Sequence, residues 1–211
     1  FTIEPQNAGY FLETGEVIPE KHGRGVDIET TIATVLKAAP GENLNLITYA
    51  IPATVGKDYF SPVFQGPTGK REVSLTINVA WGEEELPTML AIFKQHGVKA
   101  TFFFDGEWVK KFPEFVKQIE TEGHEIANHG LYHGHPVTMS KEELKRLIVD
   151  NAKLLKEVTG KEPAKLFAPP YGEFNDQIVA VAGNLGYRTI MWTIDTIDWQ
   201  RPHNRTITKV S

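Results

Sequence analysis

Two different patterns of apolar and polar positions divide the chain. Up to about residue 70 the apolar side chains are scattered among glycines and prolines, apart from a stretch of helical spacing at 27–39 and a strand-like run at 44–49. From residue 73 onward, short apolar runs typical of buried strands take turns with longer segments in which apolar positions recur every three or four residues. We therefore predict a small α+β appendage over residues 1–70 and an α/β domain over residues 71–211.

Repeated strand–helix units make up the second part of the chain. Each expected helix is followed by a glycine that ends it, and the third begins with a capping box of Ser140 and Glu143. Alternating units of this kind form a parallel sheet, either open or closed into a barrel. The expected strands are 73–79, 98–104, 124–127, 166–168 and 188–194. The expected helices are 86–96, 113–122, 141–159 and 175–185.

Polar side chains follow several of these strands. In both parallel architectures the functional residues gather at the carboxyl ends of the strands. The first expected strand ends in Asn78 and Val79, and the third leads into His129, His133 and His135. We therefore expect the functional site at this edge of the sheet.

The three histidines within seven positions indicate a metal site. Neutral imidazole is a common ligand of zinc and similar ions, and a His-x-x-x-His spacing brings two rings toward one point. The chain has no cysteine, so any metal site must use histidines and carboxylates. The alternative interpretation is a polar loop that carries surface histidines.

Composition and charge argue against a nucleic-acid-binding or membrane-spanning protein. With 41% hydrophobic and 23% charged residues, the chain of 211 residues has the make-up of a soluble globular protein. A net charge of −5 argues against a nucleic-acid binder, which usually carries a basic face. No apolar run approaches the roughly 18 residues that cross a bilayer, so no transmembrane segment is expected, and no signal peptide is visible.

Several separated motifs of the α/β domain occur in the order of a known family. They are the segments 101–104, 123–129, 167–172 and 195–199, together with the pair His129 and His133. These motifs resemble the polysaccharide deacetylases of carbohydrate esterase family 4, the NodB homology domain, and especially its divergent sporulation and cell-wall-associated members. The resemblance covers about residues 73–211. It implies a distorted (β/α) barrel with fewer than eight strands and removal of acetyl groups from polymers such as peptidoglycan or chitin.

The resemblance also implies a metal-assisted mechanism. In the family one Asp and two His hold a divalent ion, often zinc, a neighbouring Asp is the general base for the bound water, and a late His is the general acid. By this resemblance His129 and His133 are the metal ligands, and Asn78 stands at the position of the base. The main-chain N–H of Tyr171 is expected to stabilise the oxyanion.

Further motif residues receive roles in the same way. Tyr171 and Trp199 are expected to line a sugar groove, since aromatic faces suit carbohydrate rings. Asp195 and Asp198 either orient a catalytic histidine or cap turns. The remaining tryptophans are expected to pack in the core or at its rim: Trp81, Trp108 and Trp192.

The chain departs from the family pattern at the catalytic positions. The family has two adjacent Asp residues where this chain has Asn78 and Val79, and an Arg that holds the catalytic Asp where this chain has Ala168. A buried Arg without its carboxylate would be an unpaired charge that costs several kcal/mol, so these losses agree physically. The family's last motif, Leu-x-His, is not found before Ser211.

Two other residues are candidates for a third metal ligand. Either Glu83, which follows the first strand, or His135 is expected to complete a set with His129 and His133. The alternative for Glu83 is a charge near a helix N-terminus, where the helix dipole favours it.

Three functions are compatible with these observations. The first is a metal-dependent deacetylase of N-acetylated cell-surface polysaccharide, acting outside the cell or at its surface, with a rearranged site. The alternative is a catalytically inactive deacetylase-like barrel that binds glycan or a protein partner; a third is a metal-dependent hydrolase of another substrate. Segment 23–27 before a helix resembles the tail of small peptidoglycan-associated modules, so the appendage is expected to be cell-wall associated.

Overall fold

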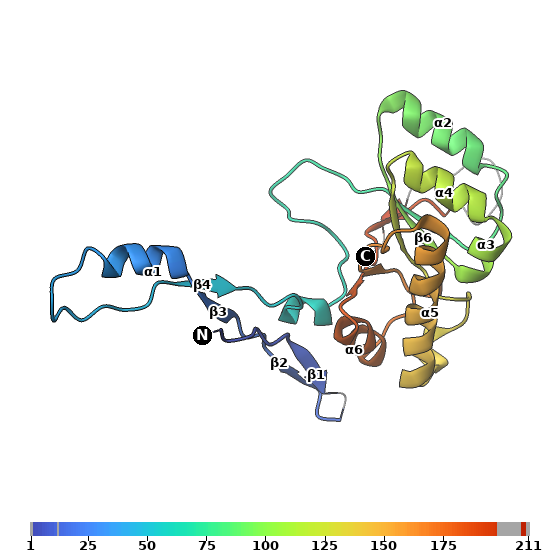
Figure 1. Cartoon of the computed structure of the whole chain (residues 1–211). Helices are drawn as coiled ribbons and strands as arrows, with labels where there is room; N and C mark the ends of the chain where they lie inside the picture. Colours follow the sequence, from blue (N-terminus) through green and yellow to red (C-terminus); the bar gives the residue numbers. More distant parts are fainter. Residues whose placement is uncertain (1, 12, 198–207, 210–211) are drawn as a thin grey trace. The chain divides into compact units, whose positions relative to one another are not determined.

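The computed structural model describes residues 2–11, 13–197 and 208–209, which belong to two compact units (Figure 1). The first unit is Phe1–Asp58 and the second is Tyr59–Ser211. This division precedes the expected boundary at residue 70. The segment after residue 58 joins the second unit because Val63 forms a parallel bridge with Ile190.

The first unit contains two antiparallel strand pairs and one helix, which is the expected α+β character. In the helix, α1 (Ile28–Val35), the Asp27 carboxylate accepts from the Thr30 N–H at 2.9 Å and so caps the N-terminus. The helix is shorter than the predicted 27–39. β1 pairs with β2, and β3 pairs with β4. The strands are β1 (Gly9–Phe11), β2 (Glu16–Ile18), β3 (Gly23–Val26) and β4 (Thr48–Ile51).

Close packing in the β3–β4 pair explains the two glycines of segment 23–27. A Cβ on Gly23 would lie 2.2 Å from the Ile3 carbonyl oxygen, and a Cβ on Gly25 would lie 2.3 Å from the Tyr49 ring. Position 23 therefore needs glycine for the approach of a neighbouring main chain, whereas a side chain at position 25 would displace the exposed Tyr49 ring. This local packing accounts for the motif; its predicted association with the cell wall stays a prediction.

A five-stranded parallel sheet forms the basis of the second unit, in the order β5-β6-β7-β8-β9. The prediction of a parallel sheet from five strand runs is confirmed, while closure into a barrel stays a prediction. The separate strands β10 (Ile194–Asp195) and β11 (Thr208–Lys209) pair antiparallel. The sheet strands are β5 (Thr76–Val79), β6 (Thr101–Phe104), β7 (Glu125–Asn128), β8 (Leu166–Phe167) and β9 (Arg188–Thr189).

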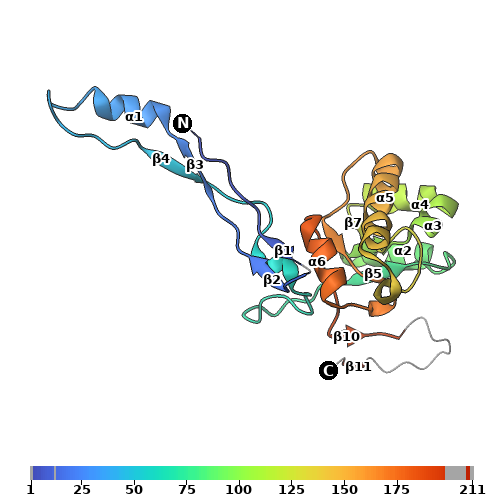
Figure 2. The same ribbon diagram turned by 90° about the horizontal axis from the view of Figure 1, so that it is seen from below.

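Helices follow the strands as predicted, with one addition. α5 contacts both α4 and α6 and lies between them (Figure 2). The unpredicted helix is α3, which Asp105 begins by accepting from the Trp108 N–H at 3.0 Å. In the described part of the chain, no helix is both long and apolar enough to span a membrane. The helices are α2 (Leu86–His96), α3 (Gly106–Lys111), α4 (Pro113–Thr121), α5 (Lys141–Thr159) and α6 (Asp176–Asn184), with short 3₁₀ turns at η1 (Lys57–Phe60), η2 (Pro136–Thr138) and η3 (Pro170–Gly172).

Side chains alternate between the two faces of the sheet. Val79, Phe102 and Phe104 belong to the main core with residues of α2 to α5. Phe103 lies in a second cluster with Ala127 and Ala168. This period of two follows from strand geometry, and it assigns position 79 to the helix-facing side of the sheet.

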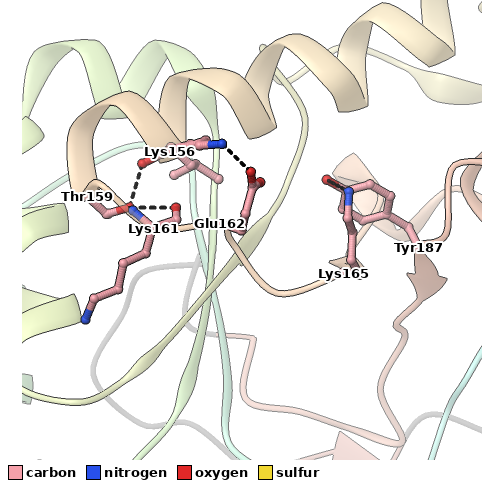
Figure 3. Close-up of polar contacts among 7 residues, drawn as sticks. Lys156, Thr159, Lys161, Glu162, Lys165 and Tyr187 are labelled. Atoms are coloured by element: carbon pink, nitrogen blue, oxygen red, sulfur yellow. Dashed lines mark hydrogen bonds and ion pairs between the residues drawn. The ribbon is translucent and has the colours of Figure 1, made fainter. Parts of the chain in front are cut away.

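Ion pairs and an aromatic contact surround the link from α5 to β8 (Figure 3). The Lys156 ammonium pairs with Glu162, and the Lys165 ammonium lies 4.4 Å from the centre of the Tyr187 ring. The Thr159 hydroxyl donates to the Leu155 carbonyl at 2.8 Å and so fastens the last turn of α5. This link leads into β8 at its amino end, so it lies away from the edge where the candidate residues gather.

Two buried asparagines tie the carboxyl ends of β6 and β7 to α5. The Asn151 amide donates to the Phe104 carbonyl at 2.8 Å and to the Asn128 side-chain oxygen at 2.9 Å. The Asn128 amide donates to the Ile148 carbonyl, and its oxygen also accepts from the Gly130 N–H, both at 2.8 Å. Both asparagine side chains are fully buried, so these bonds act in a low dielectric where losing one is costly.

We expect Asn151→Ala to lower the free energy of unfolding by about 2–4 kcal/mol, because it removes two buried hydrogen bonds, to the Phe104 carbonyl and to the Asn128 side-chain oxygen, and leaves a cavity in their place. Urea denaturation measures the change. The neighbouring, partly exposed Asp150 pairs with Lys153 at the surface and is the matched control, and Asp150→Ala should change stability by less than about 1 kcal/mol. Equal effects of the two substitutions would contradict the role given to the buried amides.

Candidate functional site

His129 follows β7 directly and is nearly fully buried. Its Nδ1 lies 2.7 Å from the Ala168 carbonyl oxygen, which can only accept a hydrogen bond. Nδ1 therefore carries the proton and Nε2 keeps its lone pair. Burial, with a smaller contribution from the nearby His133, lowers the pKa of His129 to about 4 against the opposing effect of the Ala168 hydrogen bond, so the ring is neutral at pH 7.

His133 brings a second imidazole to the same edge of the sheet. The ring centroids of His129 and His133 are 5.1 Å apart. Burial also lowers the pKa of His133, and neighbouring His135 adds to this effect. The pair predicted from the spacing is therefore brought together, and neutral imidazoles are the form that binds metal ions.

The remaining donors do not fit a catalytic metal ion. Catalytic zinc sites use three protein ligands and leave one position for water or substrate. Among the residues that the structure describes, no three His, Asp or Glu side chains form a group that could hold an ion. The described histidine pair by itself therefore does not make a catalytic metal centre.

Neither the family's catalytic positions at the end of β5 nor the two candidates for a third ligand complete a metal site among the described residues. Val79 is 5% exposed and packs in the main core, whereas Asn78 is exposed. His135 bonds through Nδ1 to a Glu173 carboxylate oxygen at 2.9 Å. Glu83 is partly exposed in the loop before α2, and neither it nor His135 joins a group of three potential ligands.

Tyr171 has a strained backbone, and its ring contacts two histidine rings. Its φ of 59° lies in the left-handed region, which is uncommon for a residue other than glycine. The ring centroid lies 4.3 Å from the centroids of both His133 and His135, edge-on to the first and stacked on the second. Tyr171 is still 55% exposed, so the site holds an aromatic surface open to solvent. Its predicted oxyanion role stays a prediction.

Glu173 is a site residue that the sequence reasoning missed. It holds the His135 ring against Tyr171 through the Nδ1 bond, and its second carboxylate oxygen is buried without a hydrogen-bond partner in the described structure. Its position two residues after Tyr171, within the same motif region, is the sequence feature that could have indicated it. The next residue but one, Asn175, caps α6 by accepting from the Ile178 N–H.

Trp81 and Trp108 behave differently, although both were expected to serve in packing. Trp108 is 2% exposed in the core, as predicted, and its indole N–H donates to the Gly82 carbonyl at 2.8 Å. Trp81 is 63% exposed, and its ring centroid lies 5.1 Å from that of His133. The indole of Trp81 is therefore a surface feature of the site, held by a loop that is fastened to the core.

The acidic residues at other strand ends have structural contacts. The Asp195 carboxylate accepts from the Ile197 N–H at 2.8 Å, which is the turn-capping alternative. Asp198 and Trp199 lie outside the described residues. Asp105, which was not predicted, caps α3 with one oxygen, and burial raises its pKa to about 6.

Family comparison agrees with the arrangement of strands and motifs. The model of the polysaccharide deacetylase family matches residues 65–190. The chain belongs to the polysaccharide deacetylase family. Family members with solved structures include the pseudoenzyme BA3943 of Bacillus anthracis, from carbohydrate esterase family 4. It is 36% identical, with a TM-score of 0.66 over 96% of this chain and 72% of that protein.

Other deacetylase-family relatives carry different names. The uncharacterised protein YlxY of Bacillus subtilis is 33% identical over 96% of this chain and 63% of its own length. A peptidoglycan-N-acetylglucosamine deacetylase of Bacillus cereus is 37% identical over 71% of this chain and 54% of its own length. The chain thus spans between half and two thirds of the length of these two relatives.

The buried His129 leads to a pH-dependent stability. Its ordinary pKa is 6.5 and its pKa in the fold is about 4, so the unfolded chain takes up the proton first as the pH falls. Stability from the neutral ring is therefore present above about pH 6.5 and is lost toward pH 4. We expect the parent to lose about 2 kcal/mol more than His129→Asn between pH 7 and pH 5 by urea denaturation.

An NMR titration of the parent supplies the control for this prediction. The His129 ring resonances, assigned by their loss in His129→Asn, should keep the shifts of neutral imidazole from pH 8 to pH 5. Protonation of that ring near pH 6.5 would contradict the buried, neutral state.

Proposed function

We propose that the α/β domain binds acetylated cell-surface polysaccharide and has lost efficient deacetylation. The observation that carries this proposal is the pair of side chains at the end of β5, the amide of Asn78 and the core-packed Val79. An amide has no proton-accepting group of useful basicity, and a valine in the core supplies no ligand. Loss of a general base alone lowers rates by about 10²–10⁴.

Contacts of the replaced residues support a settled binding site. Ala168 stands where the family pattern has an arginine, and its carbonyl accepts from the buried His129 ring. Neither a buried carboxylate nor a buried guanidinium is left without its partner by these replacements. The exposed ring of Tyr171 remains, held by His133 and His135, and offers a surface for a sugar.

Known relatives support the polymer class and the loss of activity. Among them are deacetylases of peptidoglycan and of chitooligosaccharide, and the solved B. anthracis relative is a pseudoenzyme. We propose that this chain meets such polymers at the cell surface. We also propose that its five-stranded sheet is part of the distorted barrel expected from the family.

An active metal-dependent deacetylase is the second candidate. The favouring observation is the neutral pair of His129 and His133, with the Nε2 lone pair of His129 free of the proton. A mutant of the B. anthracis pseudoenzyme has restored enzymatic activity, so a related framework supports the chemistry in that protein.

A direct assay separates these two functions. We expect chitotetraose, the tetramer of N-acetylglucosamine, to bind the purified chain in calorimetry, while mass spectrometry finds no deacetylated product, with or without added zinc. The control is the double variant His129→Ala with His133→Ala. Product formation by the parent that disappears in this variant would contradict the loss of activity and favour the enzyme.

Substitution at the end of β5 tests why the site lacks the family's carboxylates. We expect Val79→Asp to lower the free energy of unfolding by about 3 kcal/mol or more, because it buries a charge in the core. The exposed Asn78→Asp is the matched control and should change stability by less than about 1 kcal/mol. Urea denaturation with and without zinc measures both; full rescue of Val79→Asp by zinc would show that position 79 reaches the histidine pair.

A further inference from the structure

Large apolar side chains are exposed together around the histidine pair. Trp81 is 63% exposed and Tyr171 55% exposed, and both rings contact the ring of His133, at centroid distances of 5.1 Å and 4.3 Å. Exposed aromatic groups that gather at one place commonly mark a binding surface. The contacts through His133 make the two exposed rings parts of one continuous aromatic surface.

The loop that carries Trp81 is held in place by a hydrogen bond from the core. Gly82 has a φ of 74°, which favours glycine, and its carbonyl accepts from the indole N–H of the buried Trp108. The main chain next to Trp81 is therefore held in place, and the contact with His133 positions the indole, although most of that side chain is in solvent. A fixed ring loses little conformational entropy when a ligand covers it.

Tyr171 is fixed by a second set of contacts. The His135 ring stacks on it at an interplanar angle of 6°, and Glu173 holds His135 by a hydrogen bond of 2.9 Å. The two exposed rings thus come from different strand ends, and each has contacts of its own besides the shared contact with His133. Two separately supported rings allow each to hold its own part of an extended ligand.

We propose that Trp81 is a second sugar-stacking residue, so that the site holds at least two neighbouring units of an N-acetylated oligosaccharide, one on Trp81 and one on Tyr171. The proposal rests on the glycan binding proposed above. An oligosaccharide fits this surface because each sugar ring has an apolar face for an aromatic ring and polar groups at its edge for solvent and for the histidines. Its repeating units match a repeated aromatic surface better than a single small ligand does.

Calorimetry with two ligands tests the role of Trp81. We expect Trp81→Ala to weaken binding of chitotetraose about tenfold and to change the affinity for the monosaccharide N-acetylglucosamine less than about twofold. Trp81→Phe keeps an aromatic face and should retain most of the tetramer affinity. Ile92→Ala on α2, where Ile92 is 50% exposed, is the control for removing a remote exposed apolar side chain.

The outcomes distinguish this inference from the proposed function. Binding of the tetramer by the parent, with Trp81→Ala within twofold of it, overturns the role of Trp81 and leaves glycan binding in place. Equal weakening of monosaccharide and tetramer by Trp81→Ala also overturns it, since Trp81 would then act by supporting His133. A parent that binds neither ligand overturns both proposals. Thermal unfolding should be nearly unchanged in Trp81→Ala, because the side chain is mostly exposed.

Discussion

The buried hydrogen bonds of Asn128 and Asn151 position the strand ends at which the candidate site lies. They join the carboxyl ends of β6 and β7 to the middle of α5, and they do so without any charged group. Asn128 is the residue before His129, so the same bonds set the direction in which the chain leaves β7. The imidazole of His129 is buried against Ala168 as a consequence, and its neutral state follows from that burial.

Beyond His129, the site is a series of contacts between histidine and aromatic rings. His129 touches His133, His133 touches both Trp81 and Tyr171, and Tyr171 stacks on His135. Trp81 and Tyr171 are exposed, whereas His129 is buried. Exposure to solvent therefore increases from His129 outward to the two aromatic rings. Such a gradient suits a ligand with an apolar face and a polar edge better than it suits a compact ion.

Much of the fold was predictable from the sequence, because buried strands and amphipathic helices carry their own periodicity. The five sheet strands, the capping box of α5 and the pairing of His129 with His133 were all recovered. α3 was missed because its six residues are too few to show a period and Asp105 was not taken as a cap. β1 and β2 were missed because each has only three residues, too few to show a period. β3 was missed because its partner β4 is distant in sequence and glycines such as Gly25 hide a strand from propensity.

The site was predictable only in part, for a different reason. Sequence motifs assign positions but not the direction of side chains. Thus Val79 turned out to face the core, and Trp81, a residue type usually buried, turned out to be exposed. Glu173 was missed because its role depends on His135, which is distant in sequence. Long-range partners of this kind become visible only when the strand ends are brought together.

The replacements at the strand ends make physical sense as a set. A charged ligand at position 79 and an arginine at position 168 would each need a partner or an ion, and each would be costly alone at these buried positions. An amide, a core valine and an alanine have no such mutual dependence, so the fold no longer needs a metal or an ion pair at this edge. What persists is the part of the site that needs no charge: the neutral histidines and the aromatic rings around them. Replacing charged groups therefore removes the donors that catalysis needs, whereas the neutral rings proposed to hold a sugar do not depend on those charges.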